Sequence, residues 1–486
     1  MEEGASTLRV FDAVKALAFV GDLSMGQPTD HSLRTAWLAN RLAVAAGLPS
    51  EDVAMAREAA LLRWSGCTAN APGFADLFGD DVIGRQSMLA MRSEWMQAVE
   101  EAGGLEAVSP LARIHCEVAG EVARALGLGA TEKTLRHIFE AYNGQGVPDG
   151  LAGNEVPPAV FVIAIAGDIE ILSRTYGLER ASELIRMKAD AQYPSALVSL
   201  ATAQCRDWLD VLDREGDAEM EATLLTERMA NVTAAELIAD VVDLKLPWMT
   251  GFSRRVAQSA ARCCAQLGMD DAHQRRVYQA GLIHGVGRAA VPNALWASAA
   301  PLPASAWEQL RLVPYWTARA GKQIAGLSEA AEIASYAYER LDGSGYFRSV
   351  AAAAIPREAH VLGIAIMWEA LQSRRPWRDA YGAKEAAAQL RHEAQQGRVN
   401  PAIVEQIVAG ATHTEPSRRK AVESALSPRE AEVLRHISLG ASNKETARAL
   451  GLSPSTVATH VENVFRKLGC STRAAATLKA STLGLL

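Results

Sequence analysis

The sequence is poor in the features that mark secreted and membrane proteins. It holds six cysteines in 486 residues, without a CxxC pair, and only 6% aromatic residues. Disulfide-rich secreted domains and zinc sites need regularly spaced cysteines, so we expect reduced thiols. The longest apolar run, residues 157–166, is too short to span a bilayer. No apolar segment follows the acidic N-terminus, so we expect a cytoplasmic protein with no membrane partner.

The composition favours helices. Hydrophobic residues make up 49% of the chain, and alanine is abundant among them. A chain of 486 residues is long enough for two to four domains, each with its own core. Apolar residues recur at helical spacing along the chain, for example over residues 9–20, 157–175 and 179–213. The sequence therefore predicts an all-α protein.

The last sixty or so residues contain regular helix punctuation. Ser427 and Ser453 each precede a proline and open an apolar-periodic run, as an N-cap with proline at the first helical position does. Between them, Asn443 is placed to cap a short helix. Glycines are expected to end three of the helices: Gly440, Gly451 and Gly469. This pattern predicts four helices, of which the second and third form a helix-turn-helix.

This tail resembles the LuxR-type DNA-binding domain over its whole length. The resemblance is carried by Pro428-Arg429-Glu430, Val433-Leu434, Gly440, Ser442-Asn443-Lys444-Glu445, Ala447, Leu450, Ser453, Thr456-Val457, His460-Val461, Lys467-Leu468-Gly469 and Thr472-Arg473. Eight Lys/Arg against four Glu give residues 426–486 a net charge of +4. Because the whole chain has a net charge of −7, the rest of it carries −11. A basic module on an acidic body suits binding to DNA phosphates.

The resemblance implies a role for each face of the tail. In the LuxR fold the third helix enters the major groove of double-stranded DNA. The residues expected to read base edges are Ala458, Thr459, Glu462 and Asn463. Those expected to contact phosphates are Asn443, Lys444, Ser455, Thr456, Arg466 and Lys467. Those expected to pair two domains are Ala475, Leu478 and Leu483.

The rest of the chain repeats one plan. Ser32 precedes Gly66 by 34 residues, and Ser253 precedes Gly287 by 34. His115 precedes Gly144 by 29 residues, and Val313 precedes Gly343 by 30. These spacings predict a tandem duplication of one helical unit. The predicted boundaries are residues 1–212 for copy one, 213–235 for a connector, 236–411 for copy two, 412–424 for a linker and 425–486 for the tail.

Each copy resembles the HD phosphohydrolase superfamily, and copy two resembles its HD-GYP branch. The resemblance is carried by Leu282-Ile283-His284-Gly285-Val286-Gly287-Arg288, Val291-Pro292, Glu339-Arg340-Leu341-Asp342-Gly343-Ser344-Gly345-Tyr346, Glu369-Ala370-Leu371 and Arg375-Pro376-Trp377-Arg378. It spans about 150 residues. Active relatives hold two or three metal ions with His and Asp side chains, and these ions generate a hydroxide that attacks a phosphodiester. We expect Glu339 and Asp342 to brace the glycine-rich loop by hydrogen bonds.

Most of the implied metal ligands are replaced. In copy two the corresponding positions hold Phe252, His284-Gly285, Val313, Ala337-Tyr338 and Ile366. In copy one they hold His31, Arg63-Trp64, His115 and Ile138-Phe139, and Asp168 and Glu170 lie near the last position but out of register. We therefore expect no metal, no cofactor and no enzyme activity, with His31, His115 and His284 as structural residues. A composite site of these three histidines is the alternative.

These features predict a transcriptional regulator. Its inactive HD domains would sense a signal or mediate dimerisation, and its tails would bind an operator as a homodimer. A small-molecule effector would occupy the old cavity, which we expect to be lined by Trp64, Phe252, His284, Tyr338 and Trp368. The alternative function is a metal-dependent cyclic-dinucleotide phosphodiesterase fused to a DNA-binding domain.

Overall fold

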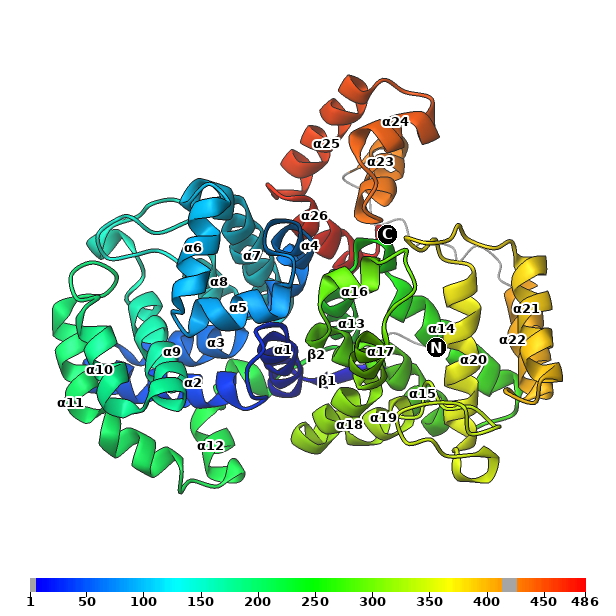
Figure 1. Cartoon of the computed structure of the whole chain (residues 1–486), viewed down its shortest axis with the longest axis horizontal. Coiled ribbons are helices and arrows are strands. Elements are labelled where there is room, and N and C mark those ends of the chain that lie inside the picture. The colour runs from blue at the N-terminus through cyan, green and yellow to red at the C-terminus, as the bar shows by residue number, and fades with distance from the viewer. Residues whose placement is uncertain (1–5, 413–425) are drawn as a thin grey trace. The chain divides into compact units, whose positions relative to one another are not determined.

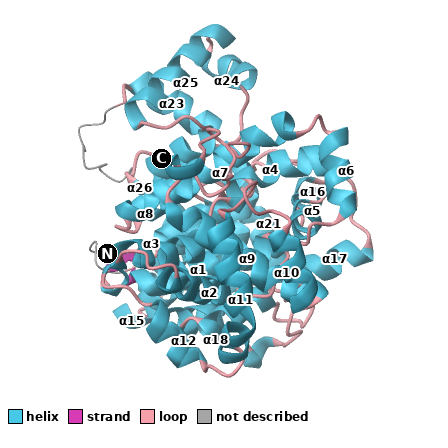
Figure 2. Ribbon diagram, turned by 90° about the vertical axis from the view of Figure 1, so that its left-hand side faces the viewer, coloured by secondary structure: helices cyan, strands magenta, loops and turns pink. Residues whose placement is uncertain are grey.

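The structure is a computed structural model that describes residues 6–412 and 426–486. Helices dominate the described chain, with one two-stranded sheet of β1 (Thr7–Arg9) and β2 (Val232–Ala234), as Figures 1 and 2 show. The all-α prediction is therefore confirmed. The chain divides into two compact units, one of residues 9–233 and one of residues 1–8 with 234–486. The predicted linker at 412–424 lies almost wholly outside the described residues.

The unit of residues 9–233 is built on the buried helix α9, which packs against α2, α3 and α10. Its helices are α1 (Val10–Ser24), α2 (His31–Ala45), α3 (Ser50–Leu62), α4 (Cys67–Phe78), α5 (Asp81–Leu89), α6 (Ser93–Glu101), α7 (Leu105–Ala125), α8 (Gly129–Arg136), α9 (Pro158–Tyr176), α10 (Leu178–Arg186), α11 (Ser195–Leu212) and α12 (Asp217–Leu224), with short 3-10 turns η1 (Gly153–Glu155) and η2 (Arg228–Ala230). Residues 179–213, predicted as one helix, are two. The first ends at Arg186, and Pro194 is the N-cap residue of the second, where a proline without an N–H is tolerated.

The other unit packs α15, α20 and α22 around α14. Up to residue 412 its helices are α13 (Glu236–Asp243), η3 (Pro247–Met249), α14 (Phe252–Gln266), α15 (Asp271–Ile283), η4 (Val286–Ala290), α16 (Asn293–Ala297), α17 (Ala304–Arg311), α18 (Val313–Gln323), η5 (Ala325–Leu327), α19 (Ser328–Ala334), η6 (Ala352–Ala354), α20 (Arg357–Leu371), α21 (Ala383–Gln395) and α22 (Pro401–Thr412). The tail adds α23 (Pro428–Ser438), α24 (Asn443–Leu450), α25 (Pro454–Leu468) and α26 (Arg473–Thr482). The four predicted tail helices are all present.

The two copies repeat the same close contacts. A side chain on Gly66 would collide with the carbonyl oxygen of His115, and one on Gly287 would collide with that of Val313. Only glycine permits so close an approach of two backbone segments. The duplication predicted from the spacing therefore has a counterpart in packing, at matching places in each copy.

The predicted connector folds as part of the first unit. It contains α12 and η2, and its Thr226 and Arg228 bind the buried carboxylate of Glu58 on α3. The distances are 2.7 Å from the Thr226 hydroxyl and 3.1 Å from the Arg228 Nε. Thr131 on α8 donates a further hydrogen bond to the same carboxylate. Residues 226–228 therefore complete the core of copy one.

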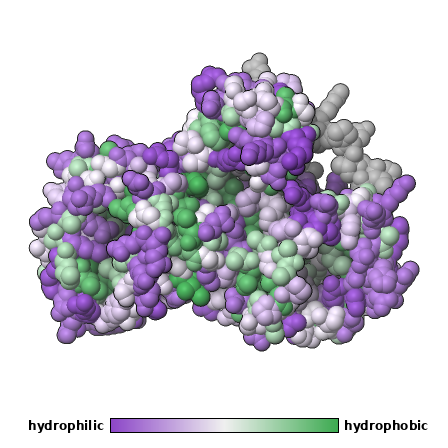
Figure 3. All heavy atoms as spheres, turned by 45° about the horizontal axis from the view of Figure 1, so that its top comes forward, coloured by the Kyte–Doolittle hydropathy of each residue, from purple (hydrophilic) through white to green (hydrophobic). Residues whose placement is uncertain are grey.

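The described helices include none long and apolar enough to cross a membrane. On the face shown in Figure 3, hydrophobic residues gather in separate areas between hydrophilic ones. Most of the buried residues in the described chain are hydrophobic.

Candidate functional site

Helix caps define the four tail helices. The Ser427 and Ser453 side chains accept hydrogen bonds from the backbone of Glu430 and Thr456, as predicted for N-caps. The predicted cap at Asn443 is wrong, because Ser442 caps α24. Its hydroxyl accepts from Glu445 N at 3.2 Å, and the Glu445 carboxylate accepts from Ser442 N at 2.8 Å. This reciprocal pair is a capping box, which needs a hydroxyl three residues before a glutamate.

Helix α25 has a buried face and a polar exposed face. Val457, Val461, Val464 and Leu468 are buried in the tail core. Thr459 and Glu462 are exposed and Ala458 and Asn463 are half-buried, so all four predicted base-reading residues lie away from that core. The arrangement leaves one face of α25 available for a DNA groove.

Five of the six predicted phosphate-binding residues are exposed: Lys444, Ser455, Thr456, Arg466 and Lys467. The Ser455 and Thr456 hydroxyls bond Ser453, and Arg466 donates to Asn463 at 3.0 Å. Lys467 donates to the Glu430 carboxylate at 2.6 Å, and Asn443 accepts from Arg473 at 2.8 Å. Burial acts to raise the pKa of Glu430, but its hydrogen bonds from Lys467 and Ser427 lower it to about 2. Lys467 therefore holds α25 against α23, a role that the sequence did not suggest.

The predicted pairing face is only partly exposed. Ala475 and Leu478 are buried within the chain, and Leu483 is 47% exposed. Two of these three residues are therefore covered, and a pairing surface would have to be built around Leu483.

The centre of copy two is a buried polar network between α13, α14 and the end of α15. Ser253 donates to Asp243 from its backbone N at 2.8 Å and from its hydroxyl at 2.7 Å. Arg288 lies 3.3 Å from Asp243 through Nη1 and 2.7 Å from His284 Nε2 through Nη2. His284 Nδ1 donates to the carbonyl of Gly281 at 2.6 Å. His284 is thus a neutral imidazole whose free lone pair is taken by Arg288.

The acidity of these groups follows from burial. Burial, and then the positive charge of Arg288, lower the pKa of His284 well below its usual range. Burial raises the pKa of Asp243 to about 6, although Arg288 and Ser253 oppose the rise. The network therefore holds one guanidinium cation against one carboxyl group of weakened acidity.

A second arginine lies beside this network, among aromatic rings. The Arg375 guanidinium lies 4.7 Å from the ring centroid of Trp248 and 4.9 Å from that of Phe252. Its side chain is 9% exposed, and its Nη1 has no hydrogen-bond partner among the described residues. Burial, followed by the charges of Arg288 and Arg378, lowers the pKa of Arg375 to about 9. We call Trp248, Phe252, His284, Arg288 and Arg375 the arginine centre.

The positions in copy two that the resemblance assigns to metal ligands do not form a metal site. Phe252, Val313, Ala337 and Ile366 carry no donor atom, and Tyr338 stacks on Tyr346 at a centroid distance of 5.2 Å. The one imidazole, His284, is bonded to a guanidinium at the nitrogen that would face a metal ion. A divalent cation would have to displace that charge and would gain one ligand, far fewer than it needs.

Copy one has a closed centre. His31 bonds Glu170 at 2.7 Å, and His115 Nε2 bonds the Arg63 carbonyl at 2.7 Å. The ring of Trp64 packs against His115 and Phe139, each at a centroid distance of 6.1 Å. Burial lowers the pKa of His115 to about 3, so its ring is neutral. Trp64, predicted to line a ligand cavity, is core.

Potential metal ligands do come together elsewhere in copy one. His137, Glu140 and Asp149 each offer a ligand atom within 4.8 Å of the others. Both Glu140 oxygens accept backbone hydrogen bonds, from Asp149 N at 2.8 Å and Leu151 N at 3.0 Å. In copy two, Glu339 braces the matching loop in the same way, accepting from Arg348 N at 2.6 Å, and Asp342 accepts from Ser344 N at 3.0 Å. The predicted bracing role of Glu339 and Asp342 is therefore observed.

Trp368 does not join the arginine centre, although the sequence predicted it there. It lines a small cavity of about 10 Å³ with Ser259, Cys263 and Ile407. Ile366, at the expected last ligand position, is two residues away on α20. Two residues along an α-helix point about 200° apart, so the two side chains face different neighbours. Sequence reasoning assigned no role at the site to Arg375 or Asp243. A signal for Asp243 was present, because a serine follows an aspartate by ten residues in both copies, Asp22-Ser32 and Asp243-Ser253.

Comparisons with known proteins match these parts separately. Residues 236–403 match the family model described as HD domain, and residues 424–480 match the model described as bacterial regulatory proteins, luxR family. The chain is 22% identical over 427 residues to the 3'3'-cGAMP-specific phosphodiesterase 3 of Vibrio cholerae serotype O1, covering 80% of this chain and 92% of that protein. The chain thus joins an HD domain to a LuxR-type DNA-binding domain.

Two further comparisons concern the tail and the fold. The CsgBAC operon transcriptional regulatory protein of Escherichia coli is 44% identical over 63 residues, which are 13% of this chain and 29% of that protein. A solved structure named as a cyclic GMP-AMP specific phosphodiesterase of V. cholerae, V-cGAP3, shares 19% identity with a TM-score of 0.59. It covers 84% of this chain and 99% of its own, and shows a shared fold.

These relatives contradict the prediction that the chain is not an enzyme. A protein that aligns with 80% of its length is named a phosphodiesterase, two that align with 36% and 44% of it carry similar names, and its fold is shared with a solved phosphodiesterase. The relatives point to enzyme activity, so the description of the HD domains as inactive is withdrawn.

Proposed function

We propose that this chain is a DNA-binding regulator that binds a cyclic dinucleotide at the arginine centre of its second HD domain. The observation that carries the proposal is Arg375, a buried guanidinium with an unpartnered Nη1 between two aromatic rings. A guanidinium is the side chain best suited to a phosphodiester, which it can bind by two parallel hydrogen bonds. Binding of an anion would offset the mutual repulsion of Arg288, Arg375 and Arg378.

The aromatic residues of the centre suit the bases of the same ligand. Trp248 and Trp377 meet edge to face at a centroid distance of 6.2 Å, and Trp377 is 52% exposed. Exposed indole rings next to arginines are surfaces on which nucleobases stack. The relatives named for cyclic dinucleotides make this class of ligand the first to test.

The proposed regulation couples this centre to the tail. A ligand that binds better to one arrangement of the protein shifts it toward that arrangement, and so changes the affinity of the tail for its operator. We also propose that two chains act as a homodimer on a palindromic site, because joining two weak half-site contacts raises apparent affinity. Sedimentation of the full chain tests the second point.

Hydrolysis of the ligand is the second candidate function, favoured by the names of the relatives. The test is to incubate the chain with 3'3'-cGAMP, with and without Mn²⁺, and to look for a linear dinucleotide product by chromatography. A linear product that disappears in Arg375→Met would assign the reaction to the arginine centre. An intact ligand after long incubation at saturation would leave binding as the function of that centre.

Titration calorimetry of the full chain with 3'3'-cGAMP and with cyclic di-GMP tests the main proposal. We expect micromolar or tighter binding, together with a shift in affinity for an operator selected from random DNA. Lack of binding by the wild-type chain would remove the proposal. Binding without any effect on the operator would remove the regulatory half of it.

A further inference from the structure

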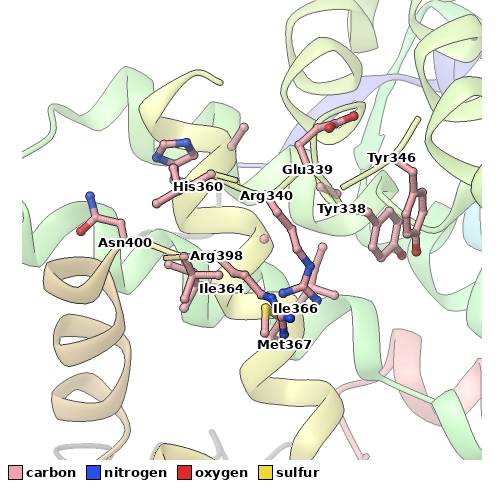
Figure 4. Close-up of a pocket in the computed structure, with 15 residues that line it drawn as sticks. Tyr338, Glu339, Arg340, Tyr346, His360, Ile364, Ile366, Met367, Arg398 and Asn400 are labelled. Atoms are coloured by element: carbon pink, nitrogen blue, oxygen red, sulfur yellow. The ribbon is translucent and has the colours of Figure 1, made fainter. Parts of the chain in front are cut away.

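Copy two contains a pocket apart from the arginine centre. It has a volume of about 90 Å³ and lies between the loop before Leu341, helix α20 and the segment that precedes α22. Figure 4 shows Arg340 and Arg398 extending toward each other, with His360 and Asn400 on one side and the stacked Tyr338 and Tyr346 on the other. Of the arginine centre, Trp248, Phe252, His284, Arg288 and Arg375, none lines this pocket.

The matching place in copy one is filled. Phe161 follows Pro157 by four residues, as His360 follows Pro356. Phe161 is buried, and its ring meets Tyr142 edge to face at a centroid distance of 5.7 Å. In copy two, His360 takes the place of Phe161 and Leu341 that of Tyr142. Two aromatic rings have thus been exchanged for smaller side chains, which leaves space.

The two arginines of the pocket are already paired with carboxylates. Arg340 donates to Glu393 at 2.7 Å, and Arg398 lies 3.4 Å from Glu393 and 3.8 Å from Asp342. The Glu339 carboxylate is occupied by backbone N–H groups of residues 348–350. Because these arginines are already paired, a charged ligand would find no free opposite charge among them, and burying it would cost desolvation free energy.

One polar atom of the pocket is unsatisfied. His360 Nε2 is buried and has no hydrogen-bond partner among the described residues. Burial lowers the pKa of His360, so the ring offers a neutral nitrogen. Ile364, Ile366 and Met367 supply apolar surface next to it. Buried polar atoms without partners are rare in native proteins and call for a ligand or a water molecule.

We propose that this pocket binds a small, uncharged, planar heterocycle with a carbonyl or ring-nitrogen acceptor, of the size of one nucleobase ring. The flat face of the ligand packs on the isoleucines and Met367, its acceptor takes a hydrogen bond from a guanidinium, and its edge satisfies His360. A cavity of roughly 150 Å³ holds benzene, so a single ring would fill this pocket of about 90 Å³ and extend into its opening to solvent.

The test is saturation-transfer NMR and calorimetry on the full chain with nicotinamide and uracil as probes. Nicotinate, the charged match of nicotinamide, is the control ligand. We expect one or both neutral probes to bind, and nicotinate to bind at least tenfold more weakly than nicotinamide. Absence of binding by both neutral probes, or tighter binding of nicotinate, would overturn the proposal.

Variants locate the site. His360→Phe restores the copy-one side chain and should abolish probe binding while leaving the melting temperature unchanged or higher. His360→Leu removes the unpartnered nitrogen and should weaken binding at least tenfold, which keeps the test valid if the first variant misfolds. His392→Phe, on the exposed surface, is the matched control and should bind as the wild type does. Wild-type binding by a folded His360 variant would refute the assignment.

Discussion

The two copies place different chemistry on the same framework. In both, a serine at the start of a helix donates its backbone N–H and its hydroxyl to a buried aspartate, Asp22 with Ser32 and Asp243 with Ser253. Copy one surrounds this pair with His31, Glu170 and aromatic core residues. Copy two places Arg288 where copy one has Cys67, each directly after the close-packed glycine. A few substitutions on a shared scaffold therefore separate a sealed core from a cationic centre.

The largest expected effect tests whether Arg288 holds the second centre together. Arg288→Met leaves Asp243 buried without its cation and His284 Nε2 without a donor. Removing one partner of a buried ion pair costs roughly 3–5 kcal/mol. We expect hydrogen exchange of α14 and α15 to accelerate accordingly. The Arg255 side chain is 43% exposed and lies 3.5 Å from Glu369, so Arg255→Met should change the free energy of unfolding of these helices by less than about 1 kcal/mol.

Ligand affinity should separate the two copies. Arg375→Met removes a charged hydrogen-bond donor from the arginine centre, and we expect 3'3'-cGAMP binding to weaken by roughly 1.5–3 kcal/mol. Arg63 is also buried and also lies over an aromatic ring, 4.4 Å from the Trp64 centroid. Arg63→Met should leave affinity unchanged. Equal losses in the two variants would mean that copy one takes part in binding.

The pH dependence of local stability should differ between the copies. Burial raises the pKa of Asp22 from 3.8 to about 7 and that of Asp243 from 3.8 to about 6. A carboxyl group with a raised pKa in the folded state stabilises that state when protonated, so its contribution is lost as pH rises through the folded pKa. The slope is at most about 1.4 kcal/mol per pH unit for one proton.

Hydrogen exchange, corrected for intrinsic rates, should therefore show α14 losing protection between pH 3.8 and about 6. The same loss in α2 should continue to about pH 7. Asp22→Asn should flatten the profile of α2 alone. Identical profiles in the two helices would contradict the difference drawn between the two carboxyl groups.

The smallest effect compares two lysines of the tail. Lys444 is exposed, so Lys444→Ala should weaken all DNA sequences alike and lower the salt slope by about one. Lys467 is bonded to Glu430, so Lys467→Ala should lower the melting temperature of the tail more than its affinity. Fluorescence anisotropy at several salt concentrations measures both. A unit loss of slope in the second variant would restore Lys467 to the DNA surface.

Local sequence signals were enough to predict the helices of the tail, but not its long-range contacts. Serine before proline, and glycine after an apolar run, fix caps within one turn of helix, so Ser427, Ser453 and Gly451 were placed correctly. Lys467 and Glu430 are 37 residues apart, and no local pattern reports their contact. Neither does any local pattern show that α26 buries Ala475 and Leu478.

The two helical copies show the same limit. The spacing of Ser253 and Gly287 led to the second centre, where Phe252 and Val313 stand at positions that the resemblance assigns to metal ligands. The arginines that enter that space come from later turns of chain, Arg375 from beyond the end of α20. Which side chain fills a vacated ligand position is a matter of tertiary packing, and the sequence does not encode it locally.

The bonds from Thr226 and Arg228 to Glu58 also bear on how such a chain can be cut or rearranged. A fragment ending at residue 212 would leave the buried Glu58 carboxylate without its hydrogen bonds from Thr226 and Arg228, and would keep only the one from Thr131 among those described above. An unpaired buried charge of this kind destabilises a domain strongly. Copy one therefore needs residues beyond its repeated helices, and expression boundaries belong near residue 233.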